Sequence, residues 1–311
     1  MATIENSSET IGNTQPTTVA APASRFTRKR MLEFFGLSAL QIVLTLLLIT
    51  FLIPMFWMFS SALKSPNEIF VVPVQWIPEV WRWGNFSNLF AEDFPLPFAI
   101  FIWNSVKVVF WAVLGTVLSS AMVAYAFSRL EWPGRDFFFG LLVATILIPE
   151  VVTLIPRFIE FRTFGWIDTH LPLTVPYWFA GTPLYVFIMR QFFRSIPKEL
   201  DEAAYMDGAG HMRILFQVIL PLSKPVIATV AVFALLQHYN EYLAPLVFIN
   251  SQDMWTLPVG LAALDATESF TFTWEMVFAG STVAVIPVII LFIFAQRYFV
   301  QGISMTGFGG R

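Results

Sequence analysis

Long apolar runs alternate with shorter polar segments along this chain. Each run is long enough to cross about 30 Å of hydrocarbon at about 1.5 Å per residue. The runs cover residues 37–59, 99–123, 137–161, 171–192, 225–248 and 276–298. The pattern predicts an all-α membrane protein with six transmembrane helices. The fourth is interrupted by Pro172, Pro176, Gly181 and Pro183, and such breaks are tolerated where neighbouring helices satisfy the freed backbone groups.

Composition supports a membrane protein. The chain is 57% hydrophobic and 13% charged, whereas soluble domains have roughly 25% charged residues. Residues 1–24 are rich in Ser, Thr, Ala and Pro, so we expect a tail that cannot bury enough surface to order itself. The predicted organisation is a basic N-terminal tail (1–34), a first helix (35–60), an extracytoplasmic loop (61–97), a five-helix core (98–299) and a C-terminal tail (300–311).

The distribution of Lys and Arg predicts the orientation in the membrane. With the N-terminus in the cytoplasm, most basic residues fall inside: Arg25, Arg28, Lys29, Arg30, Arg129, Arg135, Arg190, Arg194, Lys198, Arg213, Lys224, Arg297 and Arg311. Only Lys64, Arg82, Arg157 and Arg162 fall outside or near the outer surface. Cytoplasmic loops carry an excess of basic residues, so both termini and the polar segment 197–221 are predicted to face the cytoplasm.

Segment 197–221 reads PKELDEAAYMDGAGHMRILFQVILP and predicts a helix-turn-helix. Pro197 suits a first helical turn, and the acidic residues that follow favour the positive end of the helix dipole. Gly208 and Gly210 permit a turn, and an apolar second helix over 212–220 is expected to end at Pro221. The small side chains of Ala203 and Ala204 allow a partner to approach closely, as a helix in a groove requires.

This segment resembles the EAA loop of ABC importer membrane subunits. The family pattern is Glu-Ala-Ala, three residues, Gly, nine residues, an aliphatic residue, one more residue, then Leu-Pro. Here the pattern is Glu202, Ala203, Ala204, Gly208, Val218, Leu220 and Pro221, and only Val218, where the family prefers Ile, departs. The resemblance implies a type I ABC importer permease fold, with residues 98–299 as the permease core and 197–221 as its cytoplasmic coupling helix.

Other segments are similar to the carbohydrate-uptake branch, specifically the second permease of a maltose-type transporter. They are residues 124–129, 133–135, 148–149, 155–156, 240–242, 245–246 and 296–302, so the resemblance covers about 63–302. Residues 304–311 depart from the family's usual ending.

The resemblance also implies partners in a bacterial or archaeal cytoplasmic membrane. These are a second homologous permease, with a heterodimer favoured, two ATPase subunits that bind ATP and Mg, and an extracytoplasmic sugar-binding protein; no nucleic acid is implied. Glu202 would pair with a charge on the ATPase and Gly208 would set the turn. Asp207 would either cap the second helix or add a polar contact, and we weigh these equally.

The chain lacks motifs for chemistry of its own. It has no P-loop, no HExxH or GxSxG motif and no cysteine. His170, His211 and His238 share no motif and are interpreted as structural. We therefore expect no catalytic residue, metal or cofactor in this chain. The alternative function is an ion-coupled secondary transporter that uses the intramembrane carboxylates Glu150 and Glu241.

Charged groups inside the predicted spans are candidates for a substrate path. Each costs about 2.5 to 3.5 kcal/mol at a helix centre, so it normally faces protein or water. We predict that Lys107 pairs with Glu150 or Glu241 near an external gate, with Asn104 and Asn240 nearby. The alternative is that these groups only stabilise proline-bent helices.

Two further sets of residues are weaker candidates. Tyr177, Trp178 and Phe179 would be able to stack on a sugar, although the chain has 34 Phe, 11 Trp and 7 Tyr and most of these rings must face lipid or pack between helices. The outer loop 249–275, with Trp255, Asp265 and Glu268, is a plausible contact for a binding protein.

Overall fold

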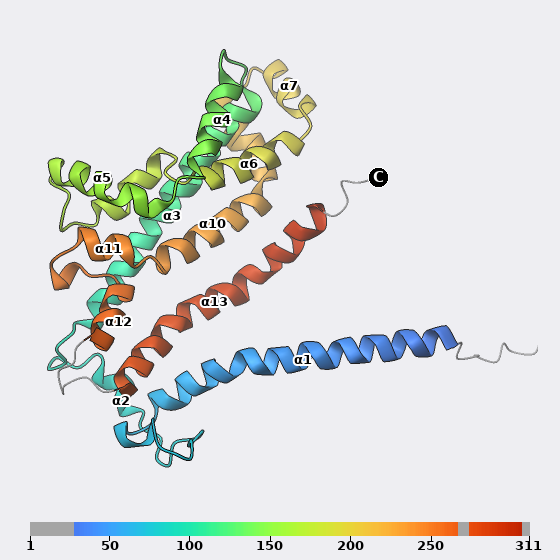
Figure 1. Cartoon of the computed structure of the whole chain (residues 1–311). Helices are drawn as coiled ribbons and strands as arrows, with labels where there is room; N and C mark the ends of the chain where they lie inside the picture. The colour runs from blue at the N-terminus through green and yellow to red at the C-terminus, as the bar shows by residue number, and fades with distance from the viewer. Residues whose placement is uncertain (1–27, 267–273, 307–311) are drawn as a thin grey trace, which may run out of the picture. The chain divides into compact units, whose positions relative to one another are not determined.

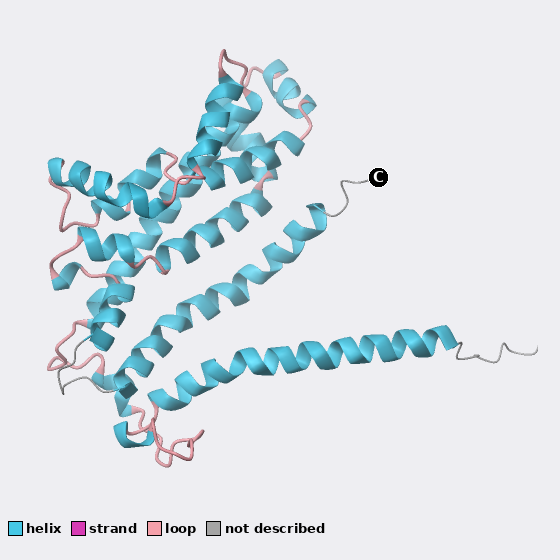
Figure 2. Cartoon of the chain, in the orientation of Figure 1, coloured by secondary structure: helices cyan, strands magenta, loops and turns pink. Residues whose placement is uncertain are grey.

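The computed structural model describes residues 28–266 and 274–306. It divides the chain into two compact units, Met1–Pro54 and Met55–Arg311. Figure 2 shows that the described residues form helices and loops, with no strand among them. The first unit contains most of helix α1 (Arg28–Ala62), whose apolar side chains surround its whole circumference, as expected for a helix in lipid.

The second unit contains the remaining helices, labelled in Figure 1. The α-helices are α2 (Gly84–Asn88), α3 (Phe98–Arg129), α4 (Arg135–Thr145), α5 (Glu150–Thr163), α6 (Pro183–Ser195), α7 (Glu199–Met206), α8 (His211–Ile214), α9 (Leu220–Leu222), α10 (Lys224–Tyr239), α11 (Leu243–Phe248), α12 (Leu257–Ala266) and α13 (Trp274–Thr306). Shorter 3-10 turns are η1 (Pro66–Glu68), η2 (Leu171–Leu173), η3 (Val175–Phe179) and η5 (Gln252–Met254), and η4 (Leu215–Ile219) is a π-helical turn.

Among the described residues, three continuous helices are long and apolar enough to cross a membrane. They are Gly36–Ala62, Phe98–Arg129 and Trp274–Phe294, and the number rises to five if each of two bent helix pairs is one span. The chain is therefore a multi-pass membrane protein, but six spans are not confirmed. The bent pairs are Arg135–Thr145 with Glu150–Thr163, at 99°, and His211–Leu222 with Lys224–Tyr239, at 82°.

Three predicted spans are not straight helices. Run 137–161 is split between α4 and α5, where Pro149 removes a backbone donor and disfavours the helical conformation of the residue before it. Run 171–192 folds as η2, η3 and only then α6, because its prolines and the left-handed Ala180 interrupt it. Run 225–248 is divided between α10 and α11 at Asn240–Tyr242.

Helix α3 is the centre of the second unit. It packs against α6, α10, η3 and α12. A buried stripe of small residues on α3, which includes Gly115, Thr116, Ser119 and Ser120, lets its neighbours approach closely, as is common between membrane helices. A side chain at Gly115 would collide with the Trp178 ring, whose atoms would lie 2.6 to 2.8 Å from an added Cβ.

The segment between α1 and α3 packs into the same unit as the core. Ala62, Leu89 and Leu96 join Phe98 and other residues of α3, α12 and α13 in one apolar cluster. Lys64 is fully buried, and its ammonium group donates a 2.5 Å hydrogen bond to the Gln75 carbonyl. Residues 61–97 are therefore an integral part of this unit.

Candidate functional site

The predicted helix-turn-helix is formed by α7, a turn and a second helical segment. Helix α7 begins two residues after Pro197, with three acidic residues in its first turn. The Gly208 backbone has a φ of 79°, which a residue with a Cβ resists, and its N–H donates to the Tyr205 carbonyl. Gly210 has an ordinary extended conformation, so only Gly208 is required for the turn. The Tyr205 hydroxyl, 2.5 Å from His211 Nδ1, joins the two helices across it.

The second helical segment ends within one residue of Pro221, the predicted limit. Ile214, Leu215 and Ile219 are buried in a cluster with α3, α6 and α10, and Leu220 packs against that cluster. Pro221 is exposed and is the penultimate residue of the helical run His211–Leu222, so this run ends one residue after the proline. The chain then bends at Ser223.

One buried arginine fixes the inward face of α7. The Arg129 side chain, at the end of α3, is 2% exposed, and its Nη1 lies 3.4 Å from the Asp201 carboxylate on α7. Its Nη2 donates to the carbonyls of Phe193 and Ile196 at the end of α6, at 2.6 and 2.8 Å. Arg129 therefore connects α3 to α7 through an ion pair and to the end of α6 through two charge-assisted hydrogen bonds.

Burial sets the protonation behaviour of this contact. Loss of hydration raises the pKa of the Asp201 carboxyl, and the nearby charges of Arg129 and Lys198 act in the opposite direction. Desolvation outweighs these two cations, so the pKa of Asp201 stays above its ordinary value and the Arg129 ion pair offsets only part of the desolvation cost.

The outward face of α7 has no covering element among the described residues. Glu199, Glu202, Ala203 and Met206 follow helical spacing along it, and all four are exposed, Met206 to 88%. Ala204 is half-buried and packs instead against the apolar cluster of α3, α6 and α10, so the two alanines of the motif lie on different sides of α7. Asp207 is exposed, and among the described residues its side chain forms no hydrogen bond with the start of α8, so the capping role is not observed.

The predicted ion pair of Lys107 with Glu150 or Glu241 is wrong. Glu150, in the first turn of α5, is paired with Arg157 two turns later, at 3.3 Å. The Glu241 carboxylate accepts a hydrogen bond from the Ala244 N–H at 3.0 Å and so caps α11. The break between α4 and α5 redirects Glu150 towards a cation on its own helix.

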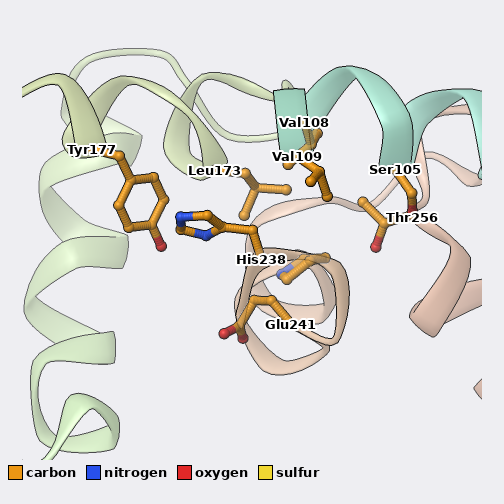
Figure 3. A pocket seen from close by; sticks show the side chains of 9 residues that line it. Ser105, Val108, Val109, Leu173, Tyr177, His238, Glu241 and Thr256 are labelled. Atoms are coloured by element: carbon orange, nitrogen blue, oxygen red, sulfur yellow. The ribbon is translucent and has the colours of Figure 1, made fainter. Parts of the chain in front are cut away.

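Glu150 and Glu241 do share a neighbourhood, around Tyr177. Both carboxylates and Arg157 lie close enough to act electrostatically on the Tyr177 hydroxyl. Figure 3 shows the ring of Tyr177 facing that of His238, with Glu241 below the His238 ring in this view. The two rings meet edge to face with centroids 4.2 Å apart, and His238 Nε2 lies 3.3 Å from the Thr116 hydroxyl.

These side chains line a small cavity between α3, the η2–η3 segment and the break after α10. Ser105, Val108, Val109, Leu173, Pro245 and Thr256 complete its wall. The space is about 10 Å³, near the smallest volume that holds one water. Of the residues predicted for the substrate path or for sugar contact, Tyr177 and Glu241 line this cavity, together with His238, which was predicted to be structural; the space is too small for a sugar.

Asn104 has a structural role near the beginning of α3, at the end opposite to Arg129. Its amide, 2% exposed, donates to the carbonyls of Asp253 and Trp255 at 2.8 and 3.0 Å. The neighbouring Ser105 hydroxyl accepts from the Leu257 N–H at 2.7 Å. Asn240, by contrast, is exposed and bonds only within the end of its own helix, to the Leu236 carbonyl.

A second set of contacts holds the same loop from the segment after α5. The Asp168 carboxylate accepts from the backbone N–H groups of Asn250 and Ser251 and from the Ser251 hydroxyl. These hydrogen bonds lower the pKa of Asp168. His170 Nε2 lies 2.9 Å from the Met254 carbonyl. We call residues 249–257 the clamped loop.

The remaining candidates differ in exposure. Trp178 packs on Gly115, whereas Phe179 is 80% exposed. Trp255 is half-buried against Phe101. Glu268 lies outside the described residues, as does the side chain of Asp265.

Arg129, Asp201 and Arg157 were missed as site residues by sequence reasoning. For Arg129 the available signal was a basic residue shortly after a predicted span, and for Asp201 it was an acidic residue directly before Glu202.

Comparison with known proteins identifies the family. Residues 115–305 match the family described as the binding-protein-dependent transport system inner membrane component. The chain belongs to this family. It is a permease component of an ABC importer, and the match includes α7, the turn at Gly208 and the C-terminal part of α3 from Gly115 on.

Similar proteins include several solute-uptake permeases. The chain is 33% identical over 257 residues to the diacetylchitobiose uptake system permease protein NgcG of Streptomyces coelicolor, covering 83% of this chain and 84% of that one. It is 30% identical to the sulfoquinovosyl glycerol transport system permease protein SmoH of Agrobacterium fabrum, covering 89% and 96%. A solved bacterial ABC transporter that imports the acidic polysaccharide alginate has a chain with a TM-score of 0.76 and 25% identity, covering 87% of this chain and 98% of that one.

Proposed function

We propose that this chain is one of two permease subunits of an ABC importer for a sugar or a sugar-derived solute. Its relatives are named for diacetylchitobiose, sulfoquinovosyl glycerol and sn-glycerol-3-phosphate, and the similar solved transporter imports alginate. All of these solutes are rich in hydroxyl or acidic groups. A second alginate transporter structure, 15% identical in sequence, contains a periplasmic protein bound to an alginate pentasaccharide, which supports delivery by a binding protein.

The observation that best supports this function is the two-sided environment of α7. Its inward face is fixed to α3 and α6 through Arg129, and its outward face presents a carboxylate, a small residue and an exposed methionine. A short helix of this kind fits a groove on a partner. We assign that groove to a cytoplasmic ATPase subunit, which binds ATP and Mg, and place both chain termini on the same side.

The anchoring suggests how ATPase motion would reach the membrane. A displacement of α7 would act on Asp201, then Arg129, and so on the ends of α3 and α6 together. Helix α3 continues to Ser105, Val108 and Val109 at the closed cavity. Opening of the cavity around Tyr177, His238 and Glu241 would then accompany movement of α3, with a second permease forming the rest of the path.

The secondary-transporter alternative is not favoured by the site. Glu150 is paired with Arg157 and Glu241 caps α11, so neither carboxylate is arranged as an exchangeable ion site.

Recovery of the ATPase with this chain from native membranes tests the proposal. Glu202→Ala should reduce the ATPase recovered by about 30-fold, as for loss of an interface contact of about 2 kcal/mol. Glu160→Ala, which removes an exposed carboxylate from α5, is the matched control and should retain it. Equal recovery with both variants, at equal insertion of the chain, would contradict docking through Glu202.

A further inference from the structure

A basic pocket lies beside the anchor of α7, where α3 ends, α4 begins and α6 ends. Its cationic lining residues are Arg129, Arg135, Arg190, Arg194 and Lys198, and Asp136, Phe127, Ser128 and Phe139 complete it. Its volume is about 420 Å³. Figure 1 shows α4, α6 and α7 gathered at one end of α3.

The charges in this pocket are not balanced by the described residues around it. Asp136 is the only acid in the lining, 3.1 Å from Arg135 and 3.7 Å from Arg190. Arg129 is paired with Asp201, which does not itself line the pocket. Arg194 and Lys198 are exposed and form no ion pair within the part of the chain that the structure describes. The pocket therefore retains a positive excess that favours an anion.

Two buried guanidinium groups are held in fixed positions in the wall of the pocket. Arg190, 7% exposed in its side chain, donates to the Phe127 carbonyl and lies over the Phe139 ring at 3.7 Å. The Arg129 side chain is 2% exposed, and its Nε is a buried donor with no hydrogen-bond partner among the described atoms. A buried donor without a partner is costly, and small rearrangement of the pocket around a bound anion would satisfy it.

The surroundings indicate an anion that belongs to a lipid. Helix α4 leads from the pocket with exposed apolar side chains, Phe137 at 72%, Phe138 at 50% and Leu141 at 55%. A soluble anion would make no contact with this apolar face, whereas the acyl chains of a lipid would pack along it. Basic pockets between membrane helices are known to bind anionic lipid headgroups.

We propose that the basic pocket binds the phosphate group of an anionic phospholipid, with its acyl chains along α4. The headgroup would then lie next to Arg129, the residue that holds α7. Lipid in the pocket would reinforce the position of α7, so transport would depend on anionic lipid. The binding step itself does not depend on the proposed docking of an ATPase.

Lipid retention by the purified full-length chain tests this directly. The chain is mixed with equal amounts of phosphatidylglycerol and phosphatidylcholine, and bound lipid is counted by native mass spectrometry. Phosphatidylglycerol should be retained preferentially. Arg194→Gln with Lys198→Gln should weaken its retention by about 30-fold, because each basic residue near a membrane surface contributes about a factor of five.

Three comparisons make the test specific. Arg213→Gln with Lys224→Gln removes two exposed cations that do not line the pocket and should leave retention unchanged. Arg194→Lys preserves the charge and should preserve binding. Millimolar inorganic phosphate should not displace the lipid. Equal retention of the two lipids, equal losses in both double variants, or displacement by free phosphate would each overturn the proposal, the last in favour of a soluble anion.

Discussion

The two ends of α3 hold neighbouring loops in different ways. At its beginning, Asn104 and Ser105 bind the clamped loop through side-chain-to-backbone hydrogen bonds, and Asp168 and His170 add more from the segment after α5. At its end, one side chain, Arg129, joins α7 and the end of α6. Several separate hydrogen bonds fix the conformation of the clamped loop. A helix whose polar attachment depends on one side chain is able to move together with that side chain, which suits α7 as a transmitter of motion.

The largest expected effect is at the single anchor. Arg129→Met removes one partner of a buried ion pair and leaves Asp201 uncompensated, so we expect a loss of about 3 to 5 kcal/mol in the free energy of unfolding. Denaturant unfolding of the purified chain in detergent measures it. The matched change Arg162→Met, at an exposed position on α5, should have little effect. Equal stability of the two variants would show that Arg129 does not act as the anchor.

A smaller effect is expected at the clamped loop. Asn104→Ala leaves two carbonyls without their donor and should cost about 2 kcal/mol, while Ser105, Asp168 and His170 continue to hold the loop. The same unfolding measurement applies, with Asn240→Ala as the control for an exposed amide that bonds only within its own helix. A loss at Asn104 larger than that at Arg129 would reverse the contrast between the two ends of α3.

The smallest effect is expected at the turn of the loop. Gly208→Ala forces a residue with a Cβ into a left-handed backbone and should cost about 1 to 2 kcal/mol, since nothing lies within 4 Å of the added atom. Gly210→Ala adds the same atom at a φ of −81° and should be nearly neutral. Similar losses for the two variants would mean that backbone conformation does not explain the glycine at 208.

The sequence predicted the parts of this molecule that depend on local pattern. Long apolar runs without breaks became α1, α3 and α13, and the acid-rich start and glycine of segment 197–221 became α7 and its turn. Sequence reasoning failed where the direction of a side chain depends on a break in its helix. Pro149 and the bend of 99° between α4 and α5 changed which cation Glu150 meets, so Lys107 was paired wrongly and Arg157 was overlooked.

The hydrophobic pattern also does not predict which distant segments contact one another. The sequence shows that Arg129 ends a span, but not that the end of α6 and Asp201 converge on it. Similarly, the sequence does not distinguish the two alanines of the motif. Only the packing of α7 shows that Ala203 is exposed and Ala204 is half-buried.

The difference between these two alanines allows the most direct test of the account. The chain contains no cysteine, so Ala203→Cys and Ala204→Cys each introduce a unique thiol. A thiol-to-amine crosslinker applied to native membranes should join the ATPase subunit to the Ala203→Cys variant and not to the Ala204→Cys variant. Crosslinking of the Ala204→Cys variant in preference to the other, or of neither variant in a complex that contains the ATPase, would contradict docking through the outward face of α7.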